Sequence, residues 1–497
     1  MNKRYIIGSA LLALLAWGCK TGEVVQNPPL ELPVAYGVKR DSSANLASEN
    51  WRMFFEDQKL KRLISNALEH NQDVRKTLER IEIANAQMLA GKRGWLPSVN
   101  GVAGASQKKF GDYTMDGVGN YDTNFSENLT EDQHIPDPYK NFMVGAEFSW
   151  ELDIWGKFKQ RKKATVARWL KSQQAANLVK TQLIANVAKI YYRIVGLDEE
   201  IIILRKNISH QETAFQLSKD LKEAGKETQL AVDQFEAQLL NSNSLLIQKE
   251  RELRSSELAL MALLGSYEGG LNRTTLSQVE FMPEVLEIGV PADLLQRRPD
   301  VRQSEYELEA SKADVHVARA AFFPSLRLFG SAGFNAFEMS KLLLSPASTF
   351  YEAGAGLVAP IFNRSQIKVA FEQAKASQRI AFLDYEQTVL KAYLEVLDMV
   401  NVYSTLDEQL ALKTDEVLVL RRSISNANTM FSVGYANYLD VINSQNRALQ
   451  AELDYVALKT EKLQSIVKLY RALGGSMSAP EELAVATDQA QEEDDVQ

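Results

Sequence analysis

The chain is a tandem duplication, and this repeat restricts its possible folds more than any other feature of the sequence. Corresponding positions in the two copies are Asp73 and Asp300, Pro97 and Pro324, Gly225 and Gly434, and Gly265 and Gly474. The offset between the copies falls from 227 to 209 residues, because one loop is shorter in the second copy. We place the first repeat at residues 51–265 and the second at 297–475. Two similar halves of this length must pack side by side or around an axis.

The first 19 residues predict export and lipidation. Residues 1–18 form a signal peptide, in which the basic pair Lys3-Arg4 precedes a short apolar core. Cys19 is the only cysteine of the chain and follows a glycine, as at the cleavage sites of bacterial lipoproteins. The alternative is an ordinary cleavage site beside an incidental cysteine. Lys20 gives no aspartate-type inner-membrane retention signal, so residues 19–50 are expected to be a lipidated linker at the outer membrane.

Composition excludes some partners and some kinds of membrane contact. The net charge is −8 and no basic segment has interleaved aromatic residues, so nucleic acid is not an expected partner. After the signal peptide, no apolar run approaches the roughly 20 residues that a membrane-spanning helix needs. Since one lipid anchor holds a protein only weakly, a second membrane contact would have to come from strands.

Four segments, 97–107, 142–153, 325–334 and 350–361, alternate between apolar and other residues as strands do. The pattern is clearest at 142–153, where the apolar residues are Phe142, Val144, Ala146, Phe148, Trp150 and Leu152. Its length and two-residue period fit a tilted strand of an outer-membrane barrel, although a soluble, half-buried strand has the same pattern. The connections 108–141 and 335–349 are rich in turn-forming residues and predict long exposed loops.

Most of the remaining sequence predicts helices. One helical run is expected at 54–93, and two proline-free helices at 157–223 and 364–433 would each be about 100 Å long. Apolar residues recur every seven positions, at Val187, Ile194, Ile201, Ile208 and Phe215 in the first copy and at Phe382, Val389, Val396, Tyr403, Leu410, Val417, Ile424 and Phe431 in the second. Such sustained heptads predict left-handed coiled-coil packing.

Two glycines predict sharp reversals of the chain. Gly225 and Gly434 end the long helices, and return helices are expected at 228–264 and 437–472, with Thr228 and Asn437 as their N-caps. Each copy therefore ends in a helical hairpin. Residues 266–296 connect the two copies, and the acidic tail 476–497 is expected to be disordered.

Four strands cannot close a membrane barrel within one chain, because the smallest such barrels have about eight strands and open edges are not tolerated in lipid. The chain must therefore form oligomers. A dimer would give eight strands and a lumen filled by side chains, whereas a trimer would give twelve. The expected fold class is mostly α with a membrane β-barrel: a trimeric 12-stranded barrel, four strands per chain, continuous with a long α-helical coiled-coil tunnel.

The sequence resembles the TolC-like outer-membrane factor family of tripartite efflux systems, and within it the OprM/NodT-type lipoproteins. Four stretches carry the resemblance: Trp51–Asp57 in the opening helix, Phe148–Lys157 from strand to helix, Pro291–Arg302 at the start of the second repeat, and Phe431–Tyr435 with Tyr438–Val441 at the second hairpin. Together these stretches and the repeats cover residues 51 to 475. Their order and their positions on the expected elements make the match specific.

The resemblance implies a homotrimeric channel in outer-membrane lipid that exports small molecules. Its hairpin tips would dock a periplasmic adaptor (membrane fusion) protein linked to an inner-membrane transporter of the resistance-nodulation-division type, and they would open as an iris. The tip residues are Ala224, Gly225, Val433, Gly434 and Tyr435. The resemblance places the periplasmic gate at Asp440 and Asn443, where relatives have acidic residues, with Asp233 near Ala231 at the first tip. Asp440 could equally complete the N-cap of its helix.

Four residues at the strands, Glu147, Glu151, Asp153 and Arg327, are expected to line the barrel lumen. The alternative is a solvated strand face with no transport role.

An enzyme is not expected, and neither is a cofactor or a bound metal. The four histidines lack metal-ligand spacing, and the sequence has no phosphate-binding loop and no nucleophile–base pair. The alternatives are a structural coiled-coil lipoprotein without a pore, or an outer-membrane factor that serves metal export or protein secretion.

Overall fold

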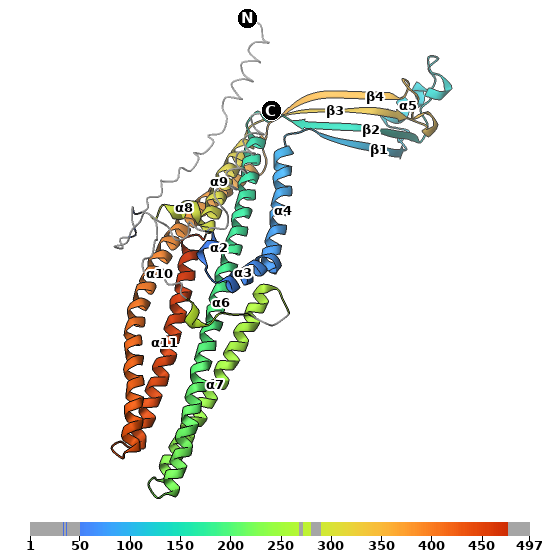
Figure 1. Cartoon of the computed structure of the whole chain (residues 1–497). Coiled ribbons are helices and arrows are strands. Elements are labelled where there is room, and N and C mark those ends of the chain that lie inside the picture. The colour runs from blue at the N-terminus through green and yellow to red at the C-terminus, as the bar shows by residue number, and fades with distance from the viewer. Residues whose placement is uncertain (1–32, 34–35, 37–49, 268–271, 280–289, 476–497) are drawn as a thin grey trace. The chain divides into compact units, whose positions relative to one another are not determined.

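The computed structural model describes residues 33, 36, 50–267, 272–279 and 290–475. Both copies of the repeat form the same elements (Figure 1). The helix before the first strand has 22 residues in each copy, in α4 (Gln72–Arg93) and α9 (Pro299–Ala320). The long helix after the second strand has 67 residues in each copy, in α6 (Lys157–Glu223) and α10 (Gln366–Ser432). The return helices α7 (Gln229–Leu264) and α11 (Tyr438–Ala472) have 36 and 35 residues.

The strands and short helices complete the described part of the chain. The strands are β1 (Ser98–Lys108), β2 (Tyr139–Glu151), β3 (Ser325–Ala336) and β4 (Thr349–Val358). The short helices are α2 (Trp51–Phe54), α3 (Gln58–His70), α5 (Met115–Thr123), η2 (Glu131–Gln133), η3 (Leu276–Gln278), α8 (Asp293–Arg297) and η4 (Met339–Lys341). The predicted mostly helical fold with four strands and an internal repeat is confirmed. No helix among the described residues has both the length and the apolar character to cross a membrane.

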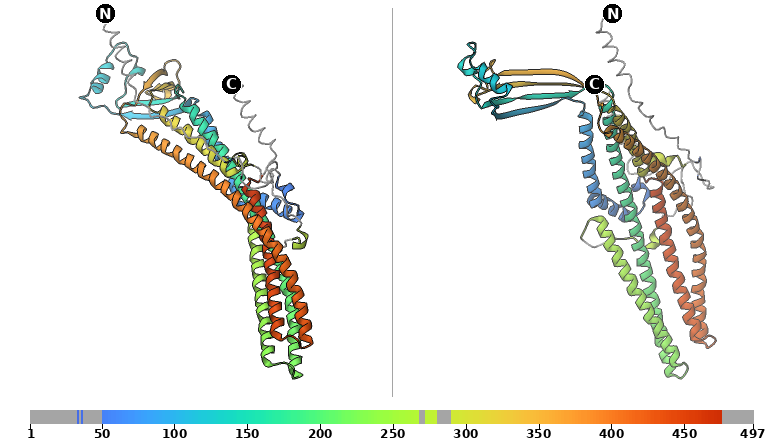
Figure 2. Two further views of the ribbon diagram at one scale, coloured as in Figure 1. Left: turned by 90° about the vertical axis from the view of Figure 1, so that its left-hand side faces the viewer. Right: turned by 180° about the vertical axis from the view of Figure 1, so that it is seen from behind.

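The described residues divide into two compact units. The first unit comprises residues 85–168 and 308–381 and contains one antiparallel sheet with the strand order β1-β2-β3-β4. The second unit comprises the described residues of 28–84, 169–307 and 382–475. It contains the hairpin of α6 with α7 and the hairpin of α10 with α11, whose tips lie at the same end of the unit in both views of Figure 2.

The coiled-coil core of the second unit follows the predicted heptads. Val187, Ile194, Val389 and Val396 are each at most 1% exposed and belong to one apolar cluster. Burial decreases toward the tips, where Phe215 and Phe431 are only half-buried. The seven-residue repeat therefore identifies the buried face of both long helices.

The opening helical run differs from the prediction of a single helix at 54–93. It is divided into α2, α3 and α4 by residues 55–57 and by Asn71. The Asn71 side chain accepts hydrogen bonds from the backbone N–H groups of Asp73 (2.9 Å) and Val74 (3.2 Å), and it donates one to the carbonyl oxygen of Leu263 (2.9 Å). Asn71 thus ends one helix and caps the next, and its contact with distant Leu263 holds it there.

Local chemistry also shifts other element boundaries. The last strand ends at Val358 and not at 361, since Pro360 has no N–H to donate to a ladder. The second long helix begins at Gln366 and not at 364, because Arg364 and Ser365 have φ values of 52° and 63°, in the left-handed region. The expected loop 108–141 contains α5, whose N-cap Thr114 accepts a hydrogen bond from the N–H of Gly117.

Several expectations fall on residues that the structure does not describe. The signal peptide, Cys19 and the tail 476–497 lie outside the described residues, as does most of the linker 19–50 and part of the connection 266–296. Tyr36, in the linker, is described: it is 6% exposed, and its ring stacks on that of Tyr393 at 5.5 Å.

Close contact between helices in each unit depends on a glycine that faces a threonine. In the second unit, a Cβ added at Gly196 of α6 would lie 2.2 Å from the Oγ1 atom of Thr460 in α11. In the first unit, a Cβ at Gly91 of α4 would lie 2.2 Å from Oγ1 of Thr165 in α6. Neither helix pair could approach as closely with a larger residue at the glycine.

We predict that Gly196→Ala lowers the melting temperature of the protein, with a loss of about 1–3 kcal/mol from overpacking. The sign of the change in stability is informative, because replacing glycine by alanine at an open helical position should instead stabilise the protein by about 0.5–1 kcal/mol. Calorimetry in detergent at a fixed scan rate would measure the change.

Two variants control this prediction. Thr460→Ala removes the clashing atoms, so the double variant should recover most of the loss. Gly119→Ala in α5, where an added Cβ meets nothing within 4 Å, should not lower the melting temperature. A stabilised Gly196→Ala protein would contradict the proposed close contact.

Candidate functional site: a sheet with one apolar face and two hairpin tips

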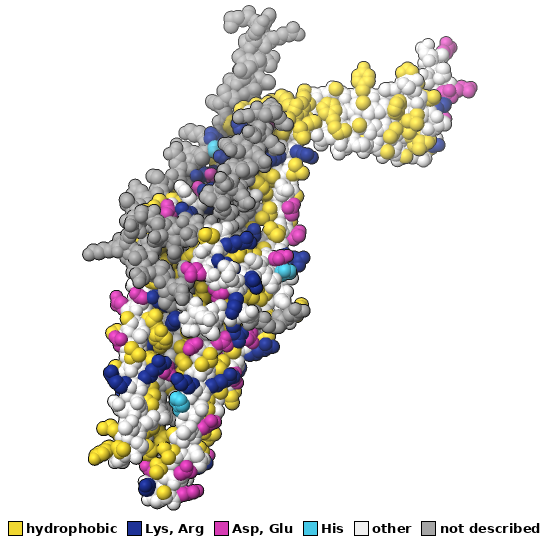
Figure 3. All heavy atoms as spheres, viewed as in Figure 1, with side chains coloured by type: hydrophobic (Ala, Val, Ile, Leu, Met, Phe, Trp, Pro, Cys, Tyr) yellow, Lys and Arg dark blue, Asp and Glu magenta, His cyan; other side chains and the backbone are white. Residues whose placement is uncertain are grey.

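The sheet of the first unit has one face made almost entirely of apolar residues. Register partners lie on the same face of a sheet, and Ala103, Val144 and Phe334 are partners, as are Val99, Phe148 and Gly330. The same face carries Ala105, Phe142, Ala146, Trp150, Leu326, Leu328, Ala332, Tyr351, Ala353, Ala355 and Leu357. On the side visible in Figure 3, the middle of the sheet shows hydrophobic and uncharged side chains, and charged ones lie at its ends.

The opposite face carries most of the polar residues and glycines of the sheet, with a minority of apolar residues (Val102, Met143, Phe329, Phe350 and Val358). It carries Glu147, Glu151 and Arg327, three of the residues expected to line a lumen. Glu151 forms ion pairs with Lys157 (Oε1–Nζ, 2.8 Å) and with Arg327 (Oε2–Nη2, 3.5 Å). These three side chains border a cavity of about 230 Å³ at the end of the strands, together with Trp155 and Phe323.

Asp153, the fourth residue expected in the lumen, lies beyond the end of β2. Its carboxylate accepts hydrogen bonds from the N–H groups of Phe158 (3.0 Å) and Lys159 (2.9 Å) in the first turn of α6. A carboxylate in this position satisfies free amide donors and is favoured by the helix dipole. Asp153 therefore fixes the start of the long helix, a role that the alternating pattern did not indicate.

Both edges of the sheet are open within the chain. Strand β1 pairs only with β2, and β4 pairs only with β3, among the strands of the described residues. One row of backbone N–H and C=O groups on each edge strand therefore has no partner in the sheet. Such edges are templates for pairing with another strand.

The two hairpin tips have the same backbone geometry. Gly225 and Gly434 have φ values of 68° and 81°, which glycine adopts without the strain that a Cβ atom brings. The N–H of Gly225 donates to the carbonyl of Lys222 and that of Lys226 to Leu221. At the second tip, the N–H of Gly434 donates to Phe431 and that of Tyr435 to Met430. These bonds form a Schellman cap at each tip, as the glycine pattern predicted.

The return helices start at the predicted N-caps. Thr228 Oγ1 accepts from the N–H of Ala231 (3.3 Å). Asn437 and Asp440 form a reciprocal capping box, in which Asn437 Oδ1 accepts from the N–H of Asp440 (3.1 Å) and Asp440 Oδ2 accepts from the N–H of Asn437 (3.0 Å). Asp440 therefore performs the capping role that was one of its two predicted roles.

The other residues expected at the tips are exposed. Val433 and Tyr435 are 62% and 85% exposed, and Ala224 is also exposed. The Asp233 carboxylate accepts a hydrogen bond from the Gln229 side chain (2.6 Å), and Asn443 lies exposed one turn after Asp440. In one chain these residues lie on two separate hairpins and do not form a single cluster.

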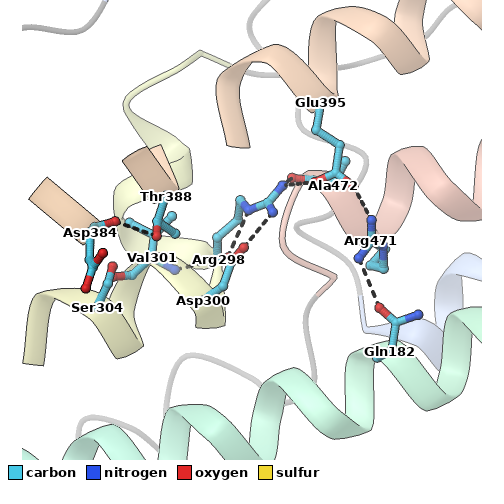
Figure 4. Close-up of polar contacts among 10 residues, drawn as sticks. All are labelled: Gln182, Arg298, Asp300, Val301, Ser304, Asp384, Thr388, Glu395, Arg471 and Ala472. Carbon is cyan, nitrogen blue, oxygen red and sulfur yellow. Dashed lines mark hydrogen bonds and ion pairs between the residues drawn. The ribbon is translucent and has the colours of Figure 1, made fainter. Parts of the chain in front are cut away.

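A buried ion network in the second unit joins the start of the second repeat to its end (Figure 4). Arg298, which ends α8 and has an 8% exposed side chain, binds both carboxylate oxygens of Asp300 (2.7 and 3.0 Å) and Glu395 of α10 (2.8 Å). It also donates to the carbonyl oxygen of Ala472 in α11 (2.7 Å). Arg471 binds the other oxygen of Glu395 and donates to Gln182 of α6 (3.0 Å).

The network shifts the pKa values of its buried members. Burial raises the pKa of Asp300, but the hydrogen bonds and charge of Arg298 lower it by more, so it lies below the ordinary carboxyl value. Burial lowers the pKa of Arg298, and Asp300 and Glu395 raise it above its usual range. In the sequence, Asp300 corresponds to Asp73 of the first copy, and the segment 298–300 belongs to the stretch that resembles the family, but neither pattern indicates an ion network. Its members Glu395 and Arg471 are too far along the chain for a local pattern to reveal.

No cluster of three or more histidine, cysteine, aspartate or glutamate side chains in the described ranges is placed to hold a metal ion.

Comparisons with known proteins agree with this arrangement. The family described as outer membrane efflux protein matches residues 63–266 and 290–475, one match for each copy. Over 468 residues the chain is 25% identical to the cation efflux system protein CusC of Escherichia coli strain K12, and the alignment covers 93% of this chain and 98% of that protein.

Two further relatives cover nearly the whole chain. The toluene efflux pump outer membrane protein TtgF of Pseudomonas putida is 27% identical over 495 residues, with 96% of this chain and 97% of that protein covered. The crystal structure of the Campylobacter jejuni CmeC outer membrane channel has a TM-score of 0.82 at 21% identity and covers 94% of this chain and 98% of that chain. The latter likeness concerns the fold alone.

We predict that Arg298→Met destabilises the protein by about 3 kcal/mol at pH 7, because two carboxylates lose their buried partner. The depressed pKa of Asp300 means that wild type keeps this stabilisation above the ordinary carboxyl pKa and loses it as the pH falls through the lower, folded value. Melting temperatures of both proteins, compared at pH 7 and at about pH 3, below the ordinary carboxyl value, would measure the difference.

The difference in stability between wild type and Arg298→Met should be smaller at the lower pH, because the unpaired carboxylates of the variant take up protons there. Arg302→Met is the matched control: Arg302 pairs with Glu305 three residues away, both partly exposed, and such a pair contributes about 1 kcal/mol or less. A loss in Arg298→Met that is equal at both pH values would refute an electrostatic role.

Proposed function

Since this chain belongs to the outer membrane efflux protein family and is the outer-membrane channel of an efflux system, we propose that three copies form one gated, passive conduit. The three sheets would close into a 12-stranded barrel in the outer membrane, and the helices would extend into the periplasm as a tunnel. An adaptor protein would connect the hairpin tips to an inner-membrane transporter of the resistance-nodulation-division type. The chain itself catalyses no reaction.

The sheet with one apolar face and two open edges carries this proposal. Unpaired backbone groups cost several kcal/mol each in lipid, so an apolar sheet cannot enter a bilayer with open edges. Pairing β4 of one copy with β1 of the next satisfies both edges and closes the ring. The polar face would then line the lumen, with Glu147, Glu151 and Arg327 facing water.

Exposed apolar side chains on the long helices also favour an assembly of copies. In the second unit, Leu383, Leu390, Leu412 and Leu418 of α10 are each more than half exposed, as are Leu240 and Ile247 of α7. Leu383 and Leu390 are seven residues apart, as are Leu240 and Ile247, which places each pair on one face of its helix. Exposed apolar patches mark interaction sites in other proteins. We propose that these residues pack against the helices of neighbouring copies.

The hairpin tips would form both the docking surface and the gate. Ala224, Gly225, Val433, Gly434 and Tyr435 would contact the adaptor, with the exposed Tyr435 ring as an anchor. Asp440 would bring one carboxylate from each copy to the pore axis, with Asn443 and Asp233 nearby. Its capping bond with Asn437 supports this role, because the capping box holds the carboxylate in a fixed position.

We propose small molecules as the exported cargo. Metal cations are the second candidate, favoured by full-length similarity to a cation efflux protein and by three carboxylates (Glu147, Glu151 and Glu352) against two bases (Lys108 and Arg327) on the polar face. Membership of an efflux family disfavours a structural lipoprotein without a pore. Lipidation of Cys19 would supply a separate anchor in the outer membrane.

The trimer predicts a specific cross-link between edge strands. Ala103→Cys in β1 is combined in turn with Tyr351→Cys, Ala353→Cys or Ala355→Cys in β4. At least one of these double variants should form disulfides between chains, and the largest linked species on a non-reducing gel should contain three chains. All four positions lie on the apolar face, so antiparallel pairing brings one combination together.

The opposite face provides the control. Ala103→Cys with Glu352→Cys should give no cross-link, because the two side chains point to different faces. A ladder that ends at two chains, or the absence of cross-links in all three pairs, would reject the proposed ring.

For the gate, we predict that Asp440→Asn removes the block of single-channel conductance by divalent cations. Asparagine keeps an oxygen that accepts from the N–H of Asn437, so the helix start is preserved while the charge is lost. Conductance in planar bilayers across a magnesium titration would measure the effect.

Asp415→Asn is the matched control, since Asp415 is an exposed aspartate on α10 away from the tips. It should leave the block unchanged. If Asp440→Asn behaves like wild type, Asp440 is a cap only.

A further inference from the structure

The boundary between strands and helices in the first unit is strongly basic. Residues 92–97, 152–163, 319–324 and 359–368 are the four segments where the chain passes between helix and strand. They contain one acid, Asp153, and ten bases: Lys92, Arg93, Lys157, Lys159, Arg161, Lys162, Lys163, Arg319, Arg364 and Lys368. This excess is notable in a chain whose net charge is −8.

Six of these bases, which we name the basic belt, are exposed and have no acidic partner among the described residues: Arg93, Lys159, Arg161, Lys163, Arg364 and Lys368. The nearby acids have other partners. Asp153 accepts from two amides of α6, and Glu372, one helical turn after Lys368, pairs with Lys375 at 3.7 Å. Glu151 is likewise engaged by Lys157.

This arrangement is unfavourable for an isolated chain. Five bases lie within the first seven residues of α6, which has no acid in its first turn. Cations near a helix N-terminus are disfavoured by the helix dipole, and neighbouring cations repel one another. Anions outside the chain would relieve both costs.

Large apolar side chains are exposed beside the basic belt. Trp95 and Leu96 are 49% and 47% exposed after α4, and Ile361 and Phe362 are 97% and 87% exposed before α10. Aromatic residues at this level of a membrane protein lie at the boundary between lipid and water. The basic belt thus begins where the apolar face of the sheet ends.

We propose that the basic belt binds the anionic headgroups of phospholipids in the periplasmic leaflet of the outer membrane. The inference rests on the proposed placement of the sheet in that membrane, which puts the belt at headgroup level. Lys159 and Lys163 are one helical turn apart in α6, so the two side chains can contact one phosphate. Arg364 lies just before α10, in a left-handed conformation, and Lys368 lies in the first turn of that helix. An acidic protein surface is the competing partner, and the test separates it from lipid.

Fluorescence quenching by brominated lipids tests the proposal, because Trp95, Trp150 and Trp155 lie at the ends of the strands next to the belt. The full-length wild-type protein is reconstituted in liposomes with brominated phosphatidylglycerol or brominated phosphatidylcholine. We expect association with phosphatidylglycerol to be about fivefold tighter, as for one basic residue facing each headgroup. The ratio of the two affinities should fall toward one at about 0.5 M salt, because salt screens surface charges.

A charge-matched pair of variants completes the test. Arg93→Gln with Lys159→Gln, Lys163→Gln and Lys368→Gln should abolish the preference. Lys206→Gln with Lys219→Gln, Arg251→Gln and Arg422→Gln removes four exposed bases from the helices of the second unit and should retain it. If the belt variant does not fold, Lys159→Gln with Lys163→Gln should still reduce the preference.

Conductance of the same liposomes separates this proposal from the proposed function. If the wild-type protein conducts but shows no preference for phosphatidylglycerol, the proposed lipid binding by the basic belt is overturned and the proposed channel is not. If the folded belt variant keeps the preference for phosphatidylglycerol, the proposed lipid binding by the basic belt is also overturned. An acidic protein surface is then the favoured partner of the belt. Wild type that neither conducts nor forms trimers overturns the proposed channel.

Discussion

The unpaired backbone of the two edge strands is the constraint on which the rest of the structure depends. The sheet has an apolar face suited to lipid, but the outer edges of β1 and β4 have no hydrogen-bond partner within the sheet of the described residues. Lipid offers no hydrogen bonds to such edges, so an apolar sheet of this kind is stable in a membrane only as part of a closed ring. In the proposed assembly, strands from other copies of the chain would supply the missing partners.

Tandem duplication supplies the four strands of the sheet from one repeated structural unit. Each copy supplies two strands, one helix of 22 residues, one of 67 and a return helix, so a single structural unit is used twice. The copies must then be fixed to each other. The Arg298 network does this in the second unit through Arg471, which binds Glu395 of the second copy and donates to Gln182 of α6 in the first copy. Apolar heptads set which helix faces meet, and the ion network ties the start of the second repeat to its end.

Most of the fold could be predicted from the sequence because its main signals are local and periodic. The two-residue alternation at Phe142–Trp150 and the seven-residue repeat through Val389 and Val396 both identified faces that the structure confirms. Contacts between distant residues account for what the local patterns missed in the opening helix and in the ion network. Asn71 divides the opening helix through a bond to Leu263, and Glu395 meets Arg298 and Arg471 only after folding. The left-handed backbone at Arg364 and Ser365, which are not glycines, carried no sequence signal at all.

The hairpin tips show how duplicated elements can share a geometry and differ in chemistry. Both tips have a Schellman cap at a glycine and an N-cap that begins the return helix. The acidic member of the capping box is present only in the second copy, as Asp440, and the corresponding residue of the first copy is Ala231. Each chain thus presents one fixed carboxylate at this position instead of two. A threefold assembly would concentrate three such charges, all from the second hairpin. The second hairpin would then control ion passage, and the first would mainly complete the wall.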